Sequence, residues 1–359
     1  MNRLLVWKWV ISALVLLSHS VASMAEPFLA IETGLMCSQC HINPTGGGLR
    51  TSFGALFSQT QLPARPREEA EFWAGSNIGF VSIGANGRFS GRVVDTKDTD
   101  DNFEFDTDRV TLYINADVGD HVRLYIDQQL APDNTFNREA WVQIRNENWY
   151  LKAGKFFLPY GLRIEDDNAY IRQSTGFNFD NADDGLEVGF ENNNWSGQLS
   201  VTNGTSGRGE VDDGKQVNLR VSRLMAKWRI GFSASVNDTD AGDRTIFGIH
   251  TGFRIGPSSW LFEIDRIEDD GFAFGDLTQD VALLETDLKI RPGHYLRLTA
   301  EIQSFDLATL NDRFRYGIEY KYFPYPFTEL RVGYRKLNSD DDIAFLNSDE
   351  FFIQAHVFF

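Results

Sequence analysis

The chain has 359 residues, enough for one large domain or two ordinary ones, and its 34 basic and 51 acidic side chains give a formal net charge of −17. That acidic balance argues against binding to nucleic acid, whose phosphates would repel it, and is compatible with binding of cations. Aromatic residues make up 13% of the chain, including 29 phenylalanines, and there are 31 glycines, a composition typical of an aromatic-rich all-β protein.

Residues 1–25 are predicted to be a secretory signal peptide. Arg3 and Lys8 give it a basic start, the run VISALVLL is its apolar core, and small residues end it at Ala25. We therefore expect a mature protein that begins at Glu26 and is exported from the cytoplasm. A retained membrane anchor is the alternative.

Residues 26–58 are predicted to form a monohaem cytochrome c segment. They contain the run CSQCH, in which Cys37 and Cys40 are the only two cysteines of the chain and His41 follows directly. At this spacing two cysteines form thioethers with a haem and the histidine binds its iron. The sequence thus predicts one covalently attached haem c, bound by Cys37 and Cys40, with His41 as axial ligand to the iron. A disulfide or redox pair of the two cysteines, or a chance histidine, is the alternative.

The cytochrome segment is too small to cover a haem alone, since domains below about 40 residues rarely hold themselves together. Its glycine run, residues 46–48, forms either a loose turn or a stretch of backbone close to the porphyrin edge. Residues 59–75 contain two prolines and are typical of a linker. The domain that follows is therefore expected to cover the porphyrin.

From residue 76 to residue 359 the sequence alternates apolar and polar residues. In residues 313–322, one face carries Phe, Tyr, Ile, Tyr and Tyr, and the other carries Arg, Arg, Gly, Glu and Lys. Because successive side chains of a strand point to opposite faces, this pattern predicts strands with an apolar outer face and a polar inner face. Sixteen strands are expected, near residues 77–95, 102–118, 120–131, 137–146, 148–157, 185–192, 194–203, 214–224, 226–237, 243–255, 258–268, 278–291, 294–306, 311–323, 326–337 and 348–359.

The connections between these strands alternate between tight turns and longer, mostly acidic loops. An even number of strands with short turns at one end and long loops at the other is typical of a transmembrane β-barrel, whose closure pairs every backbone group inside the lipid. The predicted fold class is therefore all-β: a 16-stranded antiparallel barrel, residues 76–359, in the outer membrane of a Gram-negative cell. The cytochrome segment plugs its periplasmic side. The last residues, FFIQAHVFF, are similar to the C-terminal assembly signal of such barrels.

The run YLKAGKFFLPYGLRIEDDNAYIRQSTGFN, which begins at residue 150, resembles the corresponding part of phosphate-selective porins. The matching residues are Gly154, Lys155, Phe156, Pro159, Tyr160 and Gly161. The run leads into the longest connection, residues 158–184, which we predict to fold into the lumen as a constriction. The resemblance concerns barrel architecture only. It does not indicate a phosphate porin, because the loops of this chain are acidic.

The haem is expected at the periplasmic mouth, because the first strand begins and the last strand ends on the side with the tight turns. A barrel of about 16 strands has an aqueous lumen wide enough for a small plug. Candidate distal ligands of the iron are His356, Met225 and water. His356 has lumen-facing parity in the closing strand, and Met225 lies beside a periplasmic turn.

These features together resemble the fused monohaem cytochrome–porins of iron-oxidising bacteria. That family has the signature Pro-x-Phe-Ala-Arg-Gln-Thr-Gly-x-x-Cys-x-x-Cys-His at its mature N-terminus. The chain matches it at Pro27, Ala30, Thr33, Gly34, Cys37, Cys40 and His41. Leu29, Ile31 and Glu32 stand where the family has Phe, Arg and Gln.

The resemblance implies an outer-membrane electron conduit that passes electrons from an extracellular donor, such as Fe(II), through the haem to a periplasmic cytochrome. If the protein is an enzyme, it is an iron(II)-oxidising cytochrome. The expected partners are a periplasmic electron-carrier cytochrome, an extracellular reductant or metal ion, and outer-membrane lipid. No catalytic residues are predicted.

Two other functions remain open. One is a porin for small solutes whose haem segment acts as a plug or sensor, and the other is an adapter that passes electrons outward. The acidic loops, among them residues 98–101, 269–270 and 340–342, either concentrate cations at the mouth or are ordinary solvated loops.

Overall fold

The computed structural model describes residues 26–68, 72–73, 76–96, 99–132, 134–164, 166, 168–178, 181–209, 212–273, 275–306, 312–339 and 347–359. The predicted signal peptide and parts of several acidic loops, including residues 340–342, lie outside the described residues. Within the described ranges, no helix is both long enough and apolar enough to cross a membrane.

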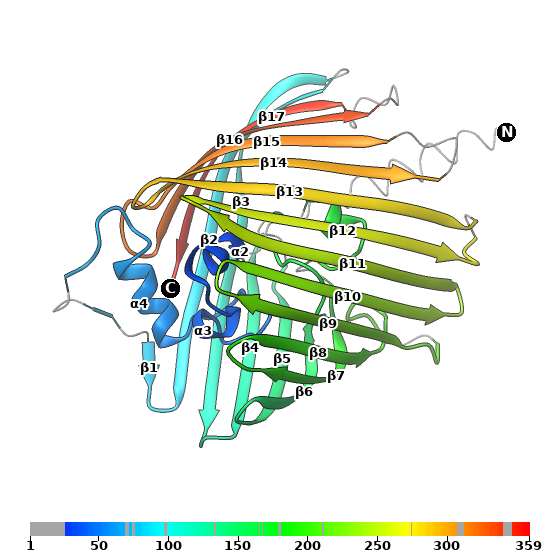
Figure 1. Ribbon diagram of the computed structural model, residues 1–359, viewed down its shortest axis with the longest axis horizontal. Coiled ribbons are helices and arrows are strands. Elements are labelled where there is room, and N and C mark those ends of the chain that lie inside the picture. Colours follow the sequence, from blue (N-terminus) through cyan, green and yellow to red (C-terminus); the bar gives the residue numbers. More distant parts are fainter. Residues whose placement is uncertain are drawn as a thin grey trace.

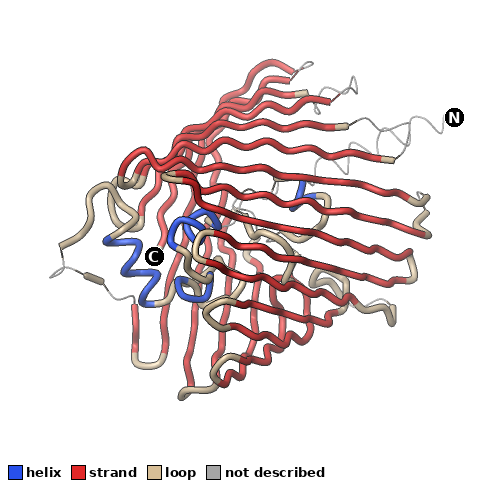
Figure 2. Tube along the Cα trace, viewed as in Figure 1, coloured by secondary structure: helices blue, strands red, loops and turns tan. Residues whose placement is uncertain are grey.

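Sixteen long antiparallel strands form one closed barrel (Figures 1 and 2). Each strand from β2 to β16 pairs with the next along the chain, and β17 closes the barrel against β2, with Ser348 opposite Thr96 and Phe358 opposite Asn86. A three-residue strand, β1, pairs with the start of β2. The prediction of a 16-stranded antiparallel barrel is confirmed. The strands are β1 (Ser76–Ile78), β2 (Val81–Thr96), β3 (Thr99–Val118), β4 (Val122–Ala131), β5 (Phe136–Asn146), β6 (Trp149–Phe157), β7 (Ala182–Glu191), β8 (Trp195–Thr202), β9 (Gln216–Met225), β10 (Trp228–Thr239), β11 (Gly242–Ile255), β12 (Ser258–Asp270), β13 (Leu277–Arg291), β14 (His294–Phe305), β15 (Arg313–Tyr322), β16 (Thr328–Ser339) and β17 (Ser348–Phe358).

The two faces of the strands follow the alternation in the sequence. In β15, Tyr316 and Ile318 are exposed on the outer surface, whereas Arg315 and Glu319 are buried on the lumenal side. Closure of the sheet leaves no long strand with an unpaired edge. An apolar exterior around a polar lumen is the arrangement of a barrel that spans a membrane.

Three short helices lie inside one end of the barrel: α2 (Pro27–Thr33), α3 (Cys37–Cys40) and α4 (Ser52–Thr60) (Figure 1). Pro27 suits the first turn of α2, because proline lacks a backbone N–H and the N–H groups of a first turn have no acceptor within the helix. Gly34 ends the helix in the left-handed conformation, with φ 71°. The hydroxyl of Thr51 caps α4 by accepting a hydrogen bond from the Gly54 N–H at 3.1 Å. Since α4 continues to Thr60, it extends two residues beyond the predicted end of the cytochrome segment.

The N-terminal segment, residues 26–62, is at the end of the barrel that has the tight turns. The side chain of Arg254, beside the turn between β11 and β12, donates a hydrogen bond to the carbonyl oxygen of Glu32 at 2.8 Å. A Cβ placed on Gly34 would be 3.7 Å from the carbonyl oxygen of Ala226, in the turn between β9 and β10. These contacts place Glu32 and Gly34 beside the tight turns of the barrel.

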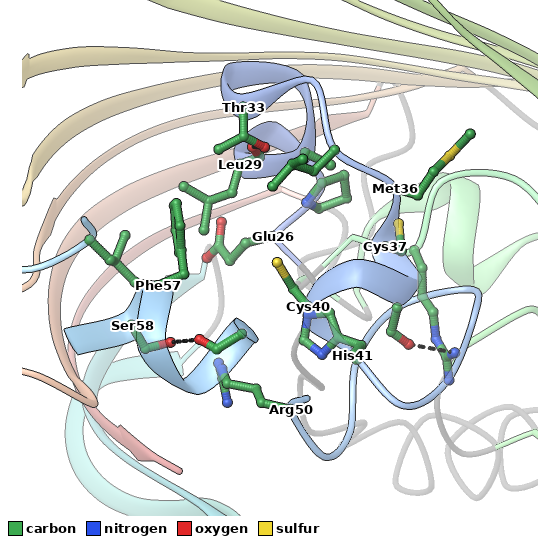
Figure 3. A pocket seen from close by; sticks show the side chains of 18 of the residues that line it. Glu26, Leu29, Thr33, Met36, Cys37, Cys40, His41, Arg50, Phe57 and Ser58 are labelled. Carbon is green, nitrogen blue, oxygen red and sulfur yellow. Dashed lines mark hydrogen bonds between the residues drawn. The ribbon is translucent and has the colours of Figure 1, made fainter. Parts of the chain in front are cut away.

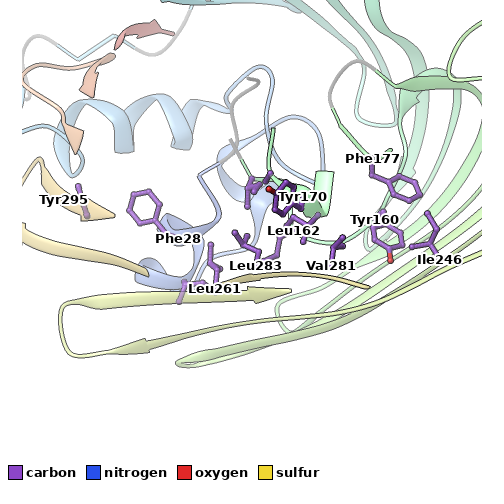
Figure 4. Close-up of a cluster of buried hydrophobic side chains, with 14 of the residues drawn as sticks. Phe28, Tyr160, Leu162, Tyr170, Phe177, Ile246, Leu261, Val281, Leu283 and Tyr295 are labelled. Atoms are coloured by element: carbon purple, nitrogen blue, oxygen red, sulfur yellow. The ribbon is translucent and has the colours of Figure 1, made fainter. Parts of the chain in front are cut away.

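The connection between β6 and β7, here called the lumenal loop (residues 158–181), folds into the barrel as predicted and carries the one-turn helix α5 (Tyr170–Gln173). The Gly161 N–H donates to Ser233 Oγ at 2.9 Å, and the Leu162 N–H donates to Glu263 Oε2 at 2.5 Å. Apolar side chains of the loop, of α2 and of the lumenal wall form one buried cluster (Figure 4). Its members include Phe28, Ile31, Tyr160, Leu162, Tyr170, Ile246, Leu261, Val281, Leu283 and Tyr295.

Candidate functional site

The two cysteines are the first and last residues of α3, so both thiols lie on a single helical turn, and His41 directly follows as its C-cap. Both cysteines are free thiols. α4 packs directly against this turn, because a Cβ on Gly54 would be only 2.1 Å from the carbonyl oxygen of Cys40. His41 also forms an isolated antiparallel bridge with Arg50. The cysteine turn is thus fixed by neighbouring backbone on two sides.

Cys37, Cys40 and His41 line a cavity of about 1020 Å³, counted with the part that is open to solvent (Figure 3). α2 and α4 form part of its wall, and the lumenal loop and the ends of β16 and β17 form another part. The lining combines apolar side chains with charged ones, among them Arg50, Arg88, Arg229 and Glu329. The apolar residues include Leu29, Leu35, Met36, Phe57, Leu62, Leu162, Phe323 and Phe358.

Burial sets the protonation states of the N-terminal residues of the cavity. Burial, together with the nearby guanidinium groups of Arg50 and Arg163, lowers the pKa of His41 to about 3. The ring is therefore neutral at neutral pH, and its Nδ1 has no hydrogen-bond partner in the described part of the chain. Burial also raises the pKa of Cys40 to about 11, so that this group stays a thiol. A neutral imidazole is the form of histidine that binds a metal.

The two candidate distal ligands occupy different places. His356 is 2% exposed and lines the same cavity as the cysteines. Its Nδ1 lies 2.8 Å from Oε2 of Glu329 on the neighbouring strand, which orients the ring and, with the proton on Nδ1, leaves the lone pair on Nε2. Met225 is 40% exposed at the end of β9 and is not among the described residues that line the cavity, whereas Met36 is.

Arginines that the sequence did not single out tie the cysteine turn to the barrel. Arg229 of β10 donates to the carbonyl oxygen of Leu35 at 2.8 Å, and its Nη1 is 3.7 Å from Sγ of Cys37. Arg163 of the lumenal loop donates to Oγ1 of Thr45 at 2.6 Å. The only sequence signal for Arg229 is its lumen-facing parity, which other lumenal arginines share. Among the described residues, no group of three or more His, Cys, Asp or Glu side chains could hold a metal ion.

Two glutamates anchor the N-terminal helix α2 to the part of the barrel wall that β13, β14 and β15 form. Glu26 pairs with Arg297 at 2.9 Å and with Lys321 at 2.6 Å, and Glu32 pairs with Lys289 at 2.6 Å. Arg297 and Lys321 have almost no exposed surface. Arg297 also pairs with Glu285 and Asp287, so Glu26 joins α2 to an ion-pair network on the barrel wall.

Comparison with protein-family models found no match, and comparison with characterised protein sequences found none either. Solved structures do match. An anion-selective porin from Comamonas acidovorans is similar with a TM-score of 0.62 and 11% identity, over 78% of this chain and 99% of that porin. The outer membrane channel DcaP of Acinetobacter baumannii has a TM-score of 0.59 and 15% identity, over 78% of this chain and 97% of the channel. OmpT, an outer membrane protein of Vibrio cholerae, has a TM-score of 0.60 and 12% identity, over 78% of this chain and 100% of OmpT. The chain therefore has the fold of outer-membrane porins, and at these identities the likeness is one of fold.

Proposed function

We propose that this protein is an outer-membrane barrel whose N-terminal segment carries one covalently bound haem c, and that it conducts electrons between an extracellular donor and a periplasmic electron carrier. The main support is the cavity, which brings together Cys37, Cys40, His41 and His356 from opposite ends of the chain. The porin fold and the apolar outer surface support a location in the outer membrane.

The residues of the cavity fit a haem in kind and in surroundings. Cys37 and Cys40 would hold it through thioethers, and the neutral ring of His41 would bind the iron. His356, oriented by Glu329, is the proposed second axial ligand, because a metal-bound histidine usually donates its other N–H to a carboxylate or carbonyl. When bound, the haem would supply a one-electron couple at its iron.

The rest of the site would keep this group in place. Apolar side chains cover part of the cavity wall, and the ion pairs of Glu26 and Glu32 fix the segment against the barrel. A bilayer core is about 30 Å thick, more than one haem spans, so the extracellular donor must enter the lumen from the side with the long loops. In this proposal Fe(II) is one such donor, and the periplasmic carrier docks on the turn side.

A channel for small solutes is the second candidate, and the comparisons favour it over the conduit. The similar structures include a porin described as anion-selective and an outer membrane channel. In this function the N-terminal segment and the lumenal loop would restrict the pore.

The test is the visible spectrum of detergent-purified protein, produced together with a c-type maturation system. We expect a Soret band, and sharp α and β bands after reduction with dithionite, in the wild type but not in the Cys37→Ala/Cys40→Ala double variant. Bands that appear with anaerobic Fe(II) would support iron as the donor, and bands that appear only with dithionite would argue against it.

Single-channel recording in planar bilayers provides the second readout. A wild-type protein without haem bands that shows large, steady open currents would overturn the conduit and leave the solute channel.

A further inference from the structure

The glycine run that follows the cysteine turn reverses the direction of the chain. The three glycines, residues 46–48, have φ values of 94°, 75° and 67°, in the left-handed region that side chains rarely adopt. A Cβ on the last of them would also overlap the hydroxyl of Tyr125. After this turn, Arg50 lies directly opposite His41 in the antiparallel bridge. Directly opposite residues project their side chains from the same face, so the turn brings Arg50 next to His41.

The side chain of Arg50 is part of the cysteine cavity, which it lines together with Cys40 and His41 (Figure 3). Its guanidinium lies over the ring of Phe358, 4.0 Å from the ring centroid. This contact with an aromatic face holds the cation in place from the closing strand of the barrel. Burial lowers the pKa of Arg50 to about 10, which leaves the group cationic at neutral pH.

The guanidinium of Arg50 makes no hydrogen bond or ion pair with any residue that the structure describes. Within the described part of the chain, the acidic residues that line the cavity are Glu26 and Glu329, and both are engaged elsewhere. Glu26 pairs with Lys321 at 2.6 Å, and Oε2 of Glu329 lies 2.8 Å from Nδ1 of His356. The N–H donors of Arg50 are therefore available to a ligand in the cavity. They form a planar fork that matches the two oxygens of a carboxylate.

We propose that Arg50 binds a propionate carboxylate of the haem in the cysteine cavity. This inference rests on the proposed function, because it concerns the cofactor of that same site. The two propionates are the acidic substituents of a haem, and a hydrogen bond between a guanidinium and a carboxylate is among the strong ones in proteins.

This role explains why the glycine turn follows the cysteine turn so closely. Residues 37–50 would then supply two thioether bonds, one axial ligand and one carboxylate partner from a single hairpin. The carboxylate contact restricts rotation of the haem about its thioethers, so Arg50 acts as a positioning residue. The barrel contributes Phe358, which orients the guanidinium.

The first test is a resonance Raman spectrum of the detergent-purified full-length protein, produced together with a c-type maturation system. A bending band of the propionate side chains shifts when a hydrogen bond to the carboxylate is lost. We expect this shift in Arg50→Gln and not in the matched control Arg65→Gln. Arg65 is exposed, donates to the hydroxyl of Tyr325 at 2.7 Å and is not among the described residues that line the cavity.

The midpoint potential provides a second readout, because it responds to charge near the iron. Loss of a cation beside the haem favours the oxidised form, which carries one more positive charge, so the potential of Arg50→Gln should fall below that of the wild type. Arg50→Lys keeps the charge but lacks the planar fork. It should restore the potential while the propionate band stays displaced.

The outcomes separate this inference from the proposed function. A haem-loaded Arg50→Gln protein with the band and the potential of the wild type would overturn the role of Arg50 and leave the proposed function intact. If Arg50→Gln takes up no haem, Arg50→Lys decides, and a wild-type band in that variant overturns the role equally. A wild-type protein without haem would refute the proposed function and this inference together.

Discussion

Replacing Phe28 by alanine should release the N-terminal segment from the barrel wall. The Phe28 side chain is 0% exposed, and its ring packs edge-on against Tyr295 with the ring centroids 5.2 Å apart. The charged groups of Arg297 and Lys321 lie 5.4 and 5.3 Å from the ring centroid. The ring is thus the deepest contact of α2 with the wall, and alanine would leave most of its volume empty.

The expected magnitude follows from this burial. Truncating a fully buried phenylalanine to alanine costs about 3–5 kcal/mol. The barrel ladder is closed without the segment, so we expect this loss to weaken docking of the segment rather than folding of the barrel. At about 1.4 kcal/mol per factor of ten, the open population of the segment should rise by about two to three and a half orders of magnitude.

Hydrogen exchange read by mass spectrometry measures this directly. Peptides from residues 26–36 should lose protection by about that factor in Phe28→Ala, while peptides from the strands β10 to β14 serve as an internal reference. The matched control is Phe53→Ala: Phe53 lies on α4 with 48% of its surface exposed, so its removal should change little. If Phe28→Ala and Phe53→Ala lose equal protection, the anchoring role of Phe28 is refuted.

Three further predictions concern the helix contact, the lumenal loop and the proposed distal ligand. Gly54→Val should push α4 away from the cysteine turn at a cost of about 1–3 kcal/mol, because the Cβ position is 2.1 Å from a backbone oxygen, and limited proteolysis of the segment should become faster. An unchanged proteolysis rate would contradict this contact. Burial alone would raise the pKa of Asp166, but its two arginine partners hold it below the usual value. The stabilisation of the lumenal loop by this carboxylate is therefore present above the ordinary pKa of an aspartate and is lost as the pH falls through the lowered pKa. Exchange protection of residues 168–178 should fall steeply below about pH 4 in the wild type and not in Asp166→Asn, and equal profiles would show that Asp166 is not the titrating group. His356→Ala should shift the Soret band of the haem-loaded protein and Met225→Ala should not, and the reverse result would reassign the distal ligand.

Most of the barrel could be predicted from the sequence because its strands obey one simple rule. The long strands alternate an apolar outer face with a polar inner face. This alternation has a period of two residues, so it can be recognised in the sequence without knowledge of the tertiary structure. The short strand β1, residues 76–78, was not predicted separately, since three residues carry too little periodicity. Apolar residues at lumenal positions, such as Val281 and Leu283, are exceptions to the polar lumen, and they lie where the lumenal loop and α2 pack.

The candidate site was predictable only where its signal is local. Cys37, Cys40 and His41 lie close together in sequence, and their spacing fits a single helical turn. His356 could be nominated from strand parity, but its contact with Glu329 depends on the register of β16 against β17. The lumenal arginines give no signal of their own, because a lumen-facing arginine of the site has the same pattern as any other. These residues are far from the N-terminal segment in sequence. Only closure of the barrel brings the strands that carry them next to the segment, so the contacts cannot be predicted from the sequence.

The two candidate functions make opposite demands on the contacts that hold the segment. A solute channel needs a continuous water-filled path, so the cluster that joins α2, the lumenal loop and the wall would be an obstacle that opens or thins during transport. An electron conduit needs the same cluster to stay closed, because a fixed and dry cavity keeps the cofactor in one position between donor and acceptor. Loosening the segment with Phe28→Ala should therefore increase conductance in both cases. Only in a conduit should it also slow the transfer of electrons, and measuring the two rates on one variant distinguishes the functions.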